Sequence, residues 1–366
     1  MSQPSREPPD LPIPGDATKV RRQPGTTLTR RELARLITRI ENGDRRAQQE
    51  LDKLYRHGGH ARVIGVTGSP GSGKSTLVAE LGRALRARHE PPQVGIIAVD
   101  PTSPFSGGAI LGDRIRMRDL FGDPGIFIRS MASRGALGGL AAATADVVAV
   151  LDASGFDIII IETVGAGQLE VDVASIAQTV IVVEAPGAGD EVQAVKAGIL
   201  EIADIVVVNK ADREGVLQTV SALRSALDRA APAEHMGHPD QYDVLTGQEV
   251  GAPRADARDA SLAGQEWRTP ILKVSAIHHE GIDDVMAALD RHARYLAESG
   301  EGQRRTLHHL DAEIKSRLRE LLLQQALHRI SGERYQQLLE SVSRRDLHPG
   351  EAALLLADFL INSPKP

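Results

Sequence analysis

Cysteine is absent from the 366-residue chain, which excludes disulfide bonds, thiolate metal ligands and thiol nucleophiles. The chain also lacks a surplus of positive charge, because its formal net charge is −6. General nucleic-acid binding is therefore not expected, because it needs cations that replace phosphate counterions. No apolar run approaches the ~18 residues of a membrane span, so no membrane contact is expected. The 41% hydrophobic content instead indicates a globular protein.

The N-terminal segment, residues 1–28, contains six prolines and almost no apolar periodicity, which predicts a flexible tail. It lacks the apolar h-region of a secretory signal, and Glu7, Asp10 and Asp16 argue against a mitochondrial address. We therefore expect a cytoplasmic location.

A short helical segment is predicted over residues 29–60. Thr29 and Glu32 stand at capping-box spacing, and Asn42-Gly43 provides a stop signal. The apolar residues that follow the cap fall on one helix face: Leu33, Leu36, Ile37 and Ile40.

From residue 62 onward, short β-branched runs alternate with helical patterns. The candidate strands are residues 63–68, 94–100, 125–131, 156–163, 179–185, 203–210 and 270–276. Such continuously apolar runs suit strands covered on both faces. An α/β domain over residues 61–297 is therefore expected, with a mainly parallel sheet and helices on both faces. A polar insertion at 232–265 has no legible role.

The C-terminal region, residues 298–366, is predicted to be a helical extension. Pro349 stands near the first turn of its last helix. An apolar stripe at helical spacing includes Leu307, Leu310, Ile314, Leu318, Leu321 and Leu322. Packing onto the parent domain and service as a dimerisation arm both remain open, and we expect a homodimer.

A phosphate-binding loop is predicted at GSPGSGKS, residues 68–75, which fits GxxxxGK[ST] between a strand and a helix. Lys74 would contact the β- and γ-phosphates and Ser75 would bind Mg²⁺. Backbone N–H groups and the helix dipole would favour the anion. The expected nucleotide contacts are Gly68, Ser69, Pro70, Gly71, Ser72, Gly73, Lys74, Ser75 and Thr76.

Guanine recognition is predicted from the NKAD sequence at 209–212. An aspartate such as Asp212 can accept two hydrogen bonds from the guanine edge, whereas adenine presents a reversed edge, and buried polar pairing of this kind discriminates by ~10⁴-fold. Ser-Ala-Ile at 275–277 resembles the second guanine-contacting loop of GTPases. The expected base contacts are Asn209, Lys210, Asp212, Ser275, Ala276 and Ile277, and the expected ligand is GTP or GDP.

Glu162 ends the apolar strand FDIIIIET. In an open α/β sheet the ligand lies at the carboxyl ends of the strands. Its carboxylate could therefore hold Mg²⁺ through water or orient the attacking water, and the Gly165 N–H could sense the γ-phosphate.

Seven ordered blocks resemble the methylmalonyl-CoA mutase-associated GTPases, the MeaB/ArgK/MMAA family of P-loop G-protein chaperones. They lie at residues 68–76, 100–117, 133–140, 162–170, 191–204, 209–212 and 275–276. The resemblance implies hydrolysis of GTP to GDP and phosphate, coupled to an adenosylcobalamin-dependent acyl-CoA mutase whose cofactor delivery is gated and whose activity is protected or restored. Methylmalonyl-CoA mutase is the first expectation; isobutyryl-CoA and ethylmalonyl-CoA mutases stay open.

The resemblance also carries individual residues. Asp100 and Asp113 match acidic positions near Mg²⁺, and residues 191–196 match a mobile switch that meets the partner. Gln168 is a candidate for positioning water, although its spacing from Gly165 differs from other GTPases. The expected catalytic set is Lys74, Asp113, Glu162 and Gln168, and the expected metal ligands are Ser75, Asp100, Asp113 and Glu162.

Three other functions remain open. A nickel metallochaperone GTPase would need a metal site, for which only isolated pairs such as His278-His279 and His308-His309 are present. A kinase of amino-acid transport binding proteins would need ATP, which NKAD disfavours. A nonenzymatic adaptor would use the nucleotide only to set its conformation.

Overall fold

The computed structural model describes residues 28–100, 117, 120, 122–132, 139–163, 173–187, 197–230 and 267–362. The chain divides into two compact units, residues 1–309 and 310–366. The boundary falls inside helix α10, Glu301–Arg329.

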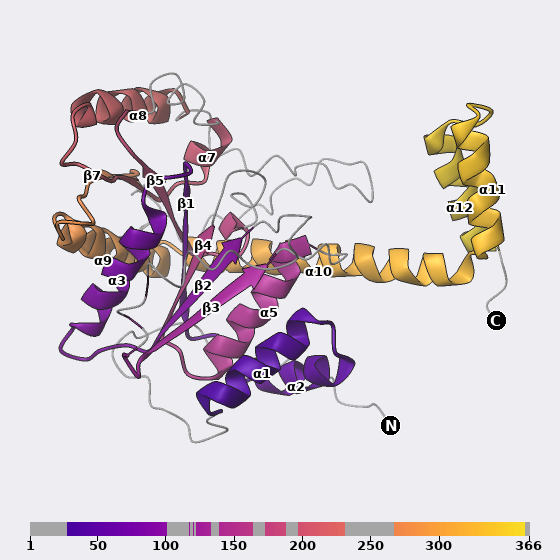
Figure 1. Cartoon of the computed structure of the whole chain (residues 1–366), viewed down its shortest axis with the longest axis horizontal. Coiled ribbons are helices and arrows are strands. Elements are labelled where there is room, and N and C mark those ends of the chain that lie inside the picture. Colours follow the sequence, from indigo (N-terminus) through magenta and orange to yellow (C-terminus); the bar gives the residue numbers. More distant parts are fainter. Residues whose placement is uncertain are drawn as a thin grey trace, which may run out of the picture. The chain divides into compact units, whose positions relative to one another are not determined.

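A seven-stranded sheet forms the centre of the first unit (Figure 1). Its strands are β1 (Arg62–Gly68), β2 (Val94–Asp100), β3 (Ile126–Ala132), β4 (Ile158–Thr163), β5 (Thr179–Glu184), β6 (Ile205–Val208) and β7 (Ile271–Lys273). The strand order is β3-β2-β4-β1-β5-β6-β7, and every ladder is parallel. The predicted α/β fold with seven strands is confirmed; β6 and β7 are shorter than the sequence suggested.

Helices cover both faces of this sheet. The helices α3 (Lys74–Arg86) and α9 (Ile282–Glu298) pack on one face. The other face carries α1 (Arg30–Glu41), α2 (Arg45–Tyr55), α5 (Gly139–Ala153), α7 (Ala197–Glu201) and α8 (Val216–Ala230). Two hydrophobic cores therefore lie on opposite sides of the strands, as continuously apolar strand sequences require.

Strand β4 shows how the sequence is divided between these cores. Ile158 and Ile160 belong to the α3 side, whereas Ile159 and Ile161 belong to the α5 side. Because side chains alternate along a strand, Glu162 follows Ile160 onto the α3 side. The alternation therefore brings one carboxylate to the start of α3.

The first two helices form where the sequence predicts them. Thr29 and Glu32 make the full capping box at the start of α1, and Asn42 caps its end. The four apolar residues predicted to share one face of α1, Leu33, Leu36, Ile37 and Ile40, are all buried.

A buried ionic cluster joins the amino-terminal ends of β5 and β6, at the edge of the sheet opposite the carboxyl ends of the strands. Asp204 accepts hydrogen bonds from the Val180 N–H (2.8 Å) and from the Arg305 guanidinium (2.9 and 3.0 Å). His292 lies 3.2 Å from the same carboxylate and 2.9 Å from the Thr179 hydroxyl. Burial alone would raise the pKa of Asp204, but the hydrogen bond with His292 and the charge of Arg305 hold it below the ordinary value. Through Arg305, the first turns of α10 are tied to the sheet.

The second unit contains the rest of α10 with α11 (Gly332–Ser343) and α12 (Pro349–Asn362). Pro349 is the first helical residue of α12, as expected from its fixed φ. The Arg334 guanidinium lies 4.1 Å from the centre of the Phe359 ring and links α11 to α12. No helix in the described part of the chain is long and apolar enough to cross a bilayer.

Candidate nucleotide site

The loop between β1 and α3 has a backbone that depends on glycine. Gly68, Gly71 and Gly73 all have left-handed φ values, of 128°, 73° and 93°. A Cβ at Gly68 would collide with the Val183 backbone, and one at Gly73 would collide with the Asn209 amide. Glycine is therefore required at both positions for steric as well as conformational reasons.

The first turn of α3 is prepared for an anion. Its N-cap is Gly73, and no side chain among the described residues caps the helix. The Ser72 hydroxyl beside it is buried and has no hydrogen-bond partner in the described part of the chain. Backbone N–H groups and a buried hydroxyl are the donors that a phosphate group uses at a helix N-terminus.

Lys74 lies at the start of α3 with its ammonium directed back over the loop. Its Nζ donates to the carbonyls of Gly68 (2.7 Å) and Ser69 (3.0 Å), and the residue is only 6% exposed. The positive charge is therefore held over the loop that would enclose the phosphates.

Ser75 and Glu162 meet at the carboxyl end of β4. The Ser75 hydroxyl donates to Glu162 Oε1 at 2.5 Å, and both residues are buried. Hydroxyl and carboxylate oxygens suit Mg²⁺, which usually takes few protein ligands and completes its shell with water and substrate phosphates. The pair fits that ion. Among the described residues, no cluster of three or more His, Cys, Asp or Glu could hold a metal alone.

Two loops contain the residues predicted to contact the base: the first base loop, residues 209–212, and the second base loop, residues 275–281. Asn209 and Lys210 join the first base loop to the phosphate loop, and Asn209 also joins it to the second. Asn209 Nδ2 donates to the Ser72 carbonyl (2.8 Å), while its Oδ1 accepts from the Ala276 N–H (3.1 Å). Lys210, in the left-handed region at φ 58°, donates to the Gly71 carbonyl at 2.6 Å. One amide thus joins three segments that are far apart in the sequence.

Asp212 lies at the outer end of the same arrangement. The Ser275 hydroxyl donates to its Oδ1 at 2.5 Å, and this hydrogen bond is the main reason that its pKa is lowered. The carboxylate therefore stays ionised and can accept further hydrogen bonds. Ile277, two residues beyond Ser275, is 68% exposed, and its side chain is open to a ligand or solvent.

The structure brings together most of the residues predicted to bind the nucleotide. The phosphate loop with the first turn of α3, the loop at 209–212 and the loop at 275–277 are linked to one another by hydrogen bonds of Asn209, Lys210 and Asp212. Asp100 is the last residue of β2. It lies two residues beyond Ala98, which pairs with Glu162 in the ladder between β2 and β4. The side chain of Asp100 is outside the described structure. Asp113, Gly165 and Gln168 also lie outside the described residues, as do the predicted partner switch at 191–196 and the insertion at 232–265.

A buried glutamate that the sequence analysis missed, Glu184, forms a hydrogen bond with the phosphate loop. Ser69 Oγ donates to Glu184 Oε2 at 2.6 Å, and Glu184 is 3% exposed. Its sequence signal was the same as that of Glu162: an acid that ends an apolar strand, here TVIVVE.

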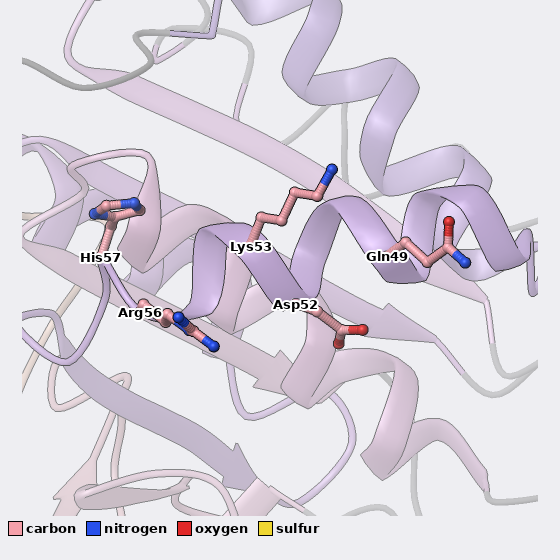
Figure 2. A pocket seen from close by; sticks show the side chains of 5 residues that line it. All are labelled: Gln49, Asp52, Lys53, Arg56 and His57. Carbon is pink, nitrogen blue, oxygen red and sulfur yellow. The ribbon is translucent and has the colours of Figure 1, made fainter.

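A separate depression of about 670 Å³ lies along α2 (Figure 2). Its lining residues are Gln49, Asp52, Lys53, Arg56 and His57. Figure 2 shows these side chains spread along α2 and the turn that follows it, without converging on one point. Because α2 packs on the α5 side of the sheet, this depression is not part of the site around α3.

Comparison with known proteins identifies a family and several relatives of this chain. The family model described as Methylmalonyl Co-A mutase-associated GTPase MeaB matches residues 33–331. A protein of Pyrococcus abyssi named as a GTPase is 41% identical over 91% of this chain and 93% of its own. A Caenorhabditis elegans protein named methylmalonic aciduria type A homolog, mitochondrial, is 31% identical over 76% of this chain and 66% of its own. A crystal structure described as a LAO/AO transport system kinase is 25% identical, with TM-score 0.59, covering 92% of this chain and all of that one.

Proposed function

Because this chain belongs to the family of methylmalonyl Co-A mutase-associated GTPases of the MeaB type, we propose that it hydrolyses GTP to GDP and phosphate in the service of an adenosylcobalamin-dependent acyl-CoA mutase. In this role it is a cytoplasmic G-protein chaperone that gates cofactor delivery and protects or reactivates the mutase. Methylmalonyl-CoA mutase is the first candidate partner, since the family description names it.

The observation that carries the nucleotide assignment is the position of Asn209. Its side chain binds both the phosphate loop, at the Ser72 carbonyl, and the second base loop, at the Ala276 N–H. A nucleotide bound along this line would have phosphates over Lys74 and its base beside Asp212. The ionised Asp212 carboxylate accepts hydrogen bonds and so suits the N1–H and amino group of guanine. A base that presents an acceptor at that edge would leave this carboxylate unsatisfied.

Ser75 and Glu162 are the described residues that would hold Mg²⁺, and Asp100 and Asp113 are proposed to join them. When bound, the ion would neutralise charge on the phosphates. The Ser75–Glu162 hydrogen bond already fixes both side chains at the start of α3. We propose that Gly165 senses the γ-phosphate, that Gln168 positions water, and that Asp113 moves toward the site only in the complex with the mutase.

A single hydrolysis experiment tests the proposal. Phosphate release from GTP is measured with and without each purified acyl-CoA mutase, and the cognate mutase is expected to raise the rate by up to ~10³-fold, as activating partners do for other GTPases. Labelled ATP with an amino-acid transport binding protein is the parallel reaction for the kinase alternative. Phosphoryl transfer from ATP to that protein, with no stimulation by any mutase, would contradict the proposal.

We also propose that α10 forms a homodimer interface. The helix has no buried residue, and its exposed apolar side chains include Leu307, Ile314, Leu318, Leu321 and Leu322.

Light scattering of the full chain at micromolar concentration is expected to give twice the monomer mass. Leu318→Glu should shift the mass toward the monomer, because it places a charge in the apolar stripe. Ser316→Glu, about 200° around the same helix, is the matched control. A monomeric wild-type protein would contradict the interface.

A further inference from the structure

The second base loop, residues 275–281 between β7 and α9, is closed on itself and constrained. Ser275 and Glu280 exchange backbone hydrogen bonds of 3.0 and 3.1 Å. The loop ends at Gly281, which has a left-handed φ of 74°. Any other residue at this position would bring its Cβ into collision with the Lys273 carbonyl. Within this closed turn, His279 also adopts a left-handed φ, of 60°.

Left-handed backbone is rare for residues with a side chain. Among the described residues only Lys210, His279 and Arg345 combine a side chain with a positive φ. Two of these three lie in the two base loops. A positive φ in a residue with a side chain is a reason to ask what that side chain contacts.

Both strained residues in the base loops extend their side chains to the segment that forms the phosphate site. Lys210 reaches the loop itself, at the Gly71 carbonyl. His279 reaches the following helix: its Nδ1 lies 2.6 Å from Glu80 Oε2. Because a carboxylate only accepts hydrogen bonds, the Nδ1 atom carries the proton and donates it.

Glu80 is a firm anchor for this bond. It lies on α3, the helix that begins with Lys74 and Ser75, and its side chain is only 9% exposed. Its second oxygen accepts from Arg83 at 2.5 Å, one turn further along the helix. The His279 ring is 63% exposed. The buried glutamate is therefore the partner whose position is fixed by its surroundings, and the histidine is held by its bond to it.

We propose that His279 is a positioning residue for guanine binding: its bond to Glu80 fastens the second base loop to the helix that carries the phosphate-binding residues. This inference rests on the proposed guanine site and adds a residue to it. The tether holds the Ser275 hydroxyl against Asp212 and the Ala276 N–H against Asn209, so recognition of the base depends on α3 as well as on the loops.

His279→Gly tests this role with little disturbance of the backbone. Glycine accepts the left-handed φ and removes only the side chain. Isothermal titration with GDP and magnesium is expected to show roughly 3- to 10-fold weaker binding, the range for loss of one partly exposed charged hydrogen bond. Affinity for inorganic pyrophosphate, which has no base, is expected to stay unchanged. Arg345→Gly relieves the same kind of backbone in the second unit and is expected to bind GDP like the wild type.

A double variant shows whether the two side chains act through one bond. If they do, His279→Gly combined with Glu80→Gln should bind GDP no more weakly than His279→Gly alone. Equal GDP affinity in His279→Gly and Arg345→Gly, or a parallel loss of pyrophosphate affinity, would overturn the role of His279. Wild-type protein that bound pyrophosphate but not GDP would instead contradict the proposed guanine site itself.

Discussion

Lys74→Ala is expected to lower the rate of GTP hydrolysis by about 10²–10³-fold, the usual cost of removing one charged group aimed at a developing negative charge. In the structure the ammonium is buried and held over the loop by the carbonyls of Gly68 and Ser69. A phosphate group that entered the loop would offer it stronger, charged acceptors. Phosphate release under single-turnover conditions, with the mutase present, measures the effect.

The control for this variant is another lysine. Lys53→Ala removes an exposed ammonium from α2, in the depression shown in Figure 2, and should hydrolyse GTP at the wild-type rate. A Lys74→Ala protein that folds normally and hydrolyses GTP as fast as the wild type would show that the phosphates lie elsewhere.

Asp212→Asn is expected to weaken GDP binding by roughly 10²-fold or more, because one of the two acceptors for the guanine edge becomes a donor. The same change should improve binding of xanthosine diphosphate, which presents a carbonyl where guanine has its amino group. Competition between the two nucleotides in calorimetry gives the change in preference directly. Asp228→Asn, an exposed carboxylate on α8, serves as the matched control.

The ionisation of Asp212 adds a pH dependence to this prediction. The hydrogen bond from Ser275 lowers the pKa of Asp212, so the carboxylate remains a double acceptor throughout the neutral and mildly acidic range. Its contribution to GDP binding should be lost only as the pH falls through that lowered pKa, below the ordinary range of aspartates. An unchanged nucleotide preference in Asp212→Asn would remove the basis for placing guanine beside this residue.

Local patterns were sufficient to predict the sheet and much of the candidate site. The isoleucine run of β4 required cover on both faces, and two cores provide it. The capping box at Thr29 and the proline at the start of α12 act within one turn of helix, so they form as the sequence indicates. The phosphate loop is likewise determined locally, because Gly68 and Gly73 occupy backbone conformations that other residues rarely adopt.

Contacts between distant segments were not predictable in this way. Glu80 and His279 are far apart in the sequence, and nothing in either helix or loop pattern specifies that they meet. The Glu184–Ser69 bond depends on β5 lying next to β1, which follows from the strand order and not from either strand alone. In the same way, Asp204 obtains Arg305 as a partner only because α10 starts near the beginning of β6.

The alternation of side chains along β4 limits how this strand can change. Exchange of one isoleucine for valine would leave every neighbour on its own face of the sheet. Deletion of a single isoleucine would turn Glu162 toward α5 and separate it from Ser75. The number of residues in this run, more than their identity, is therefore what aligns an acid with the first turn of α3.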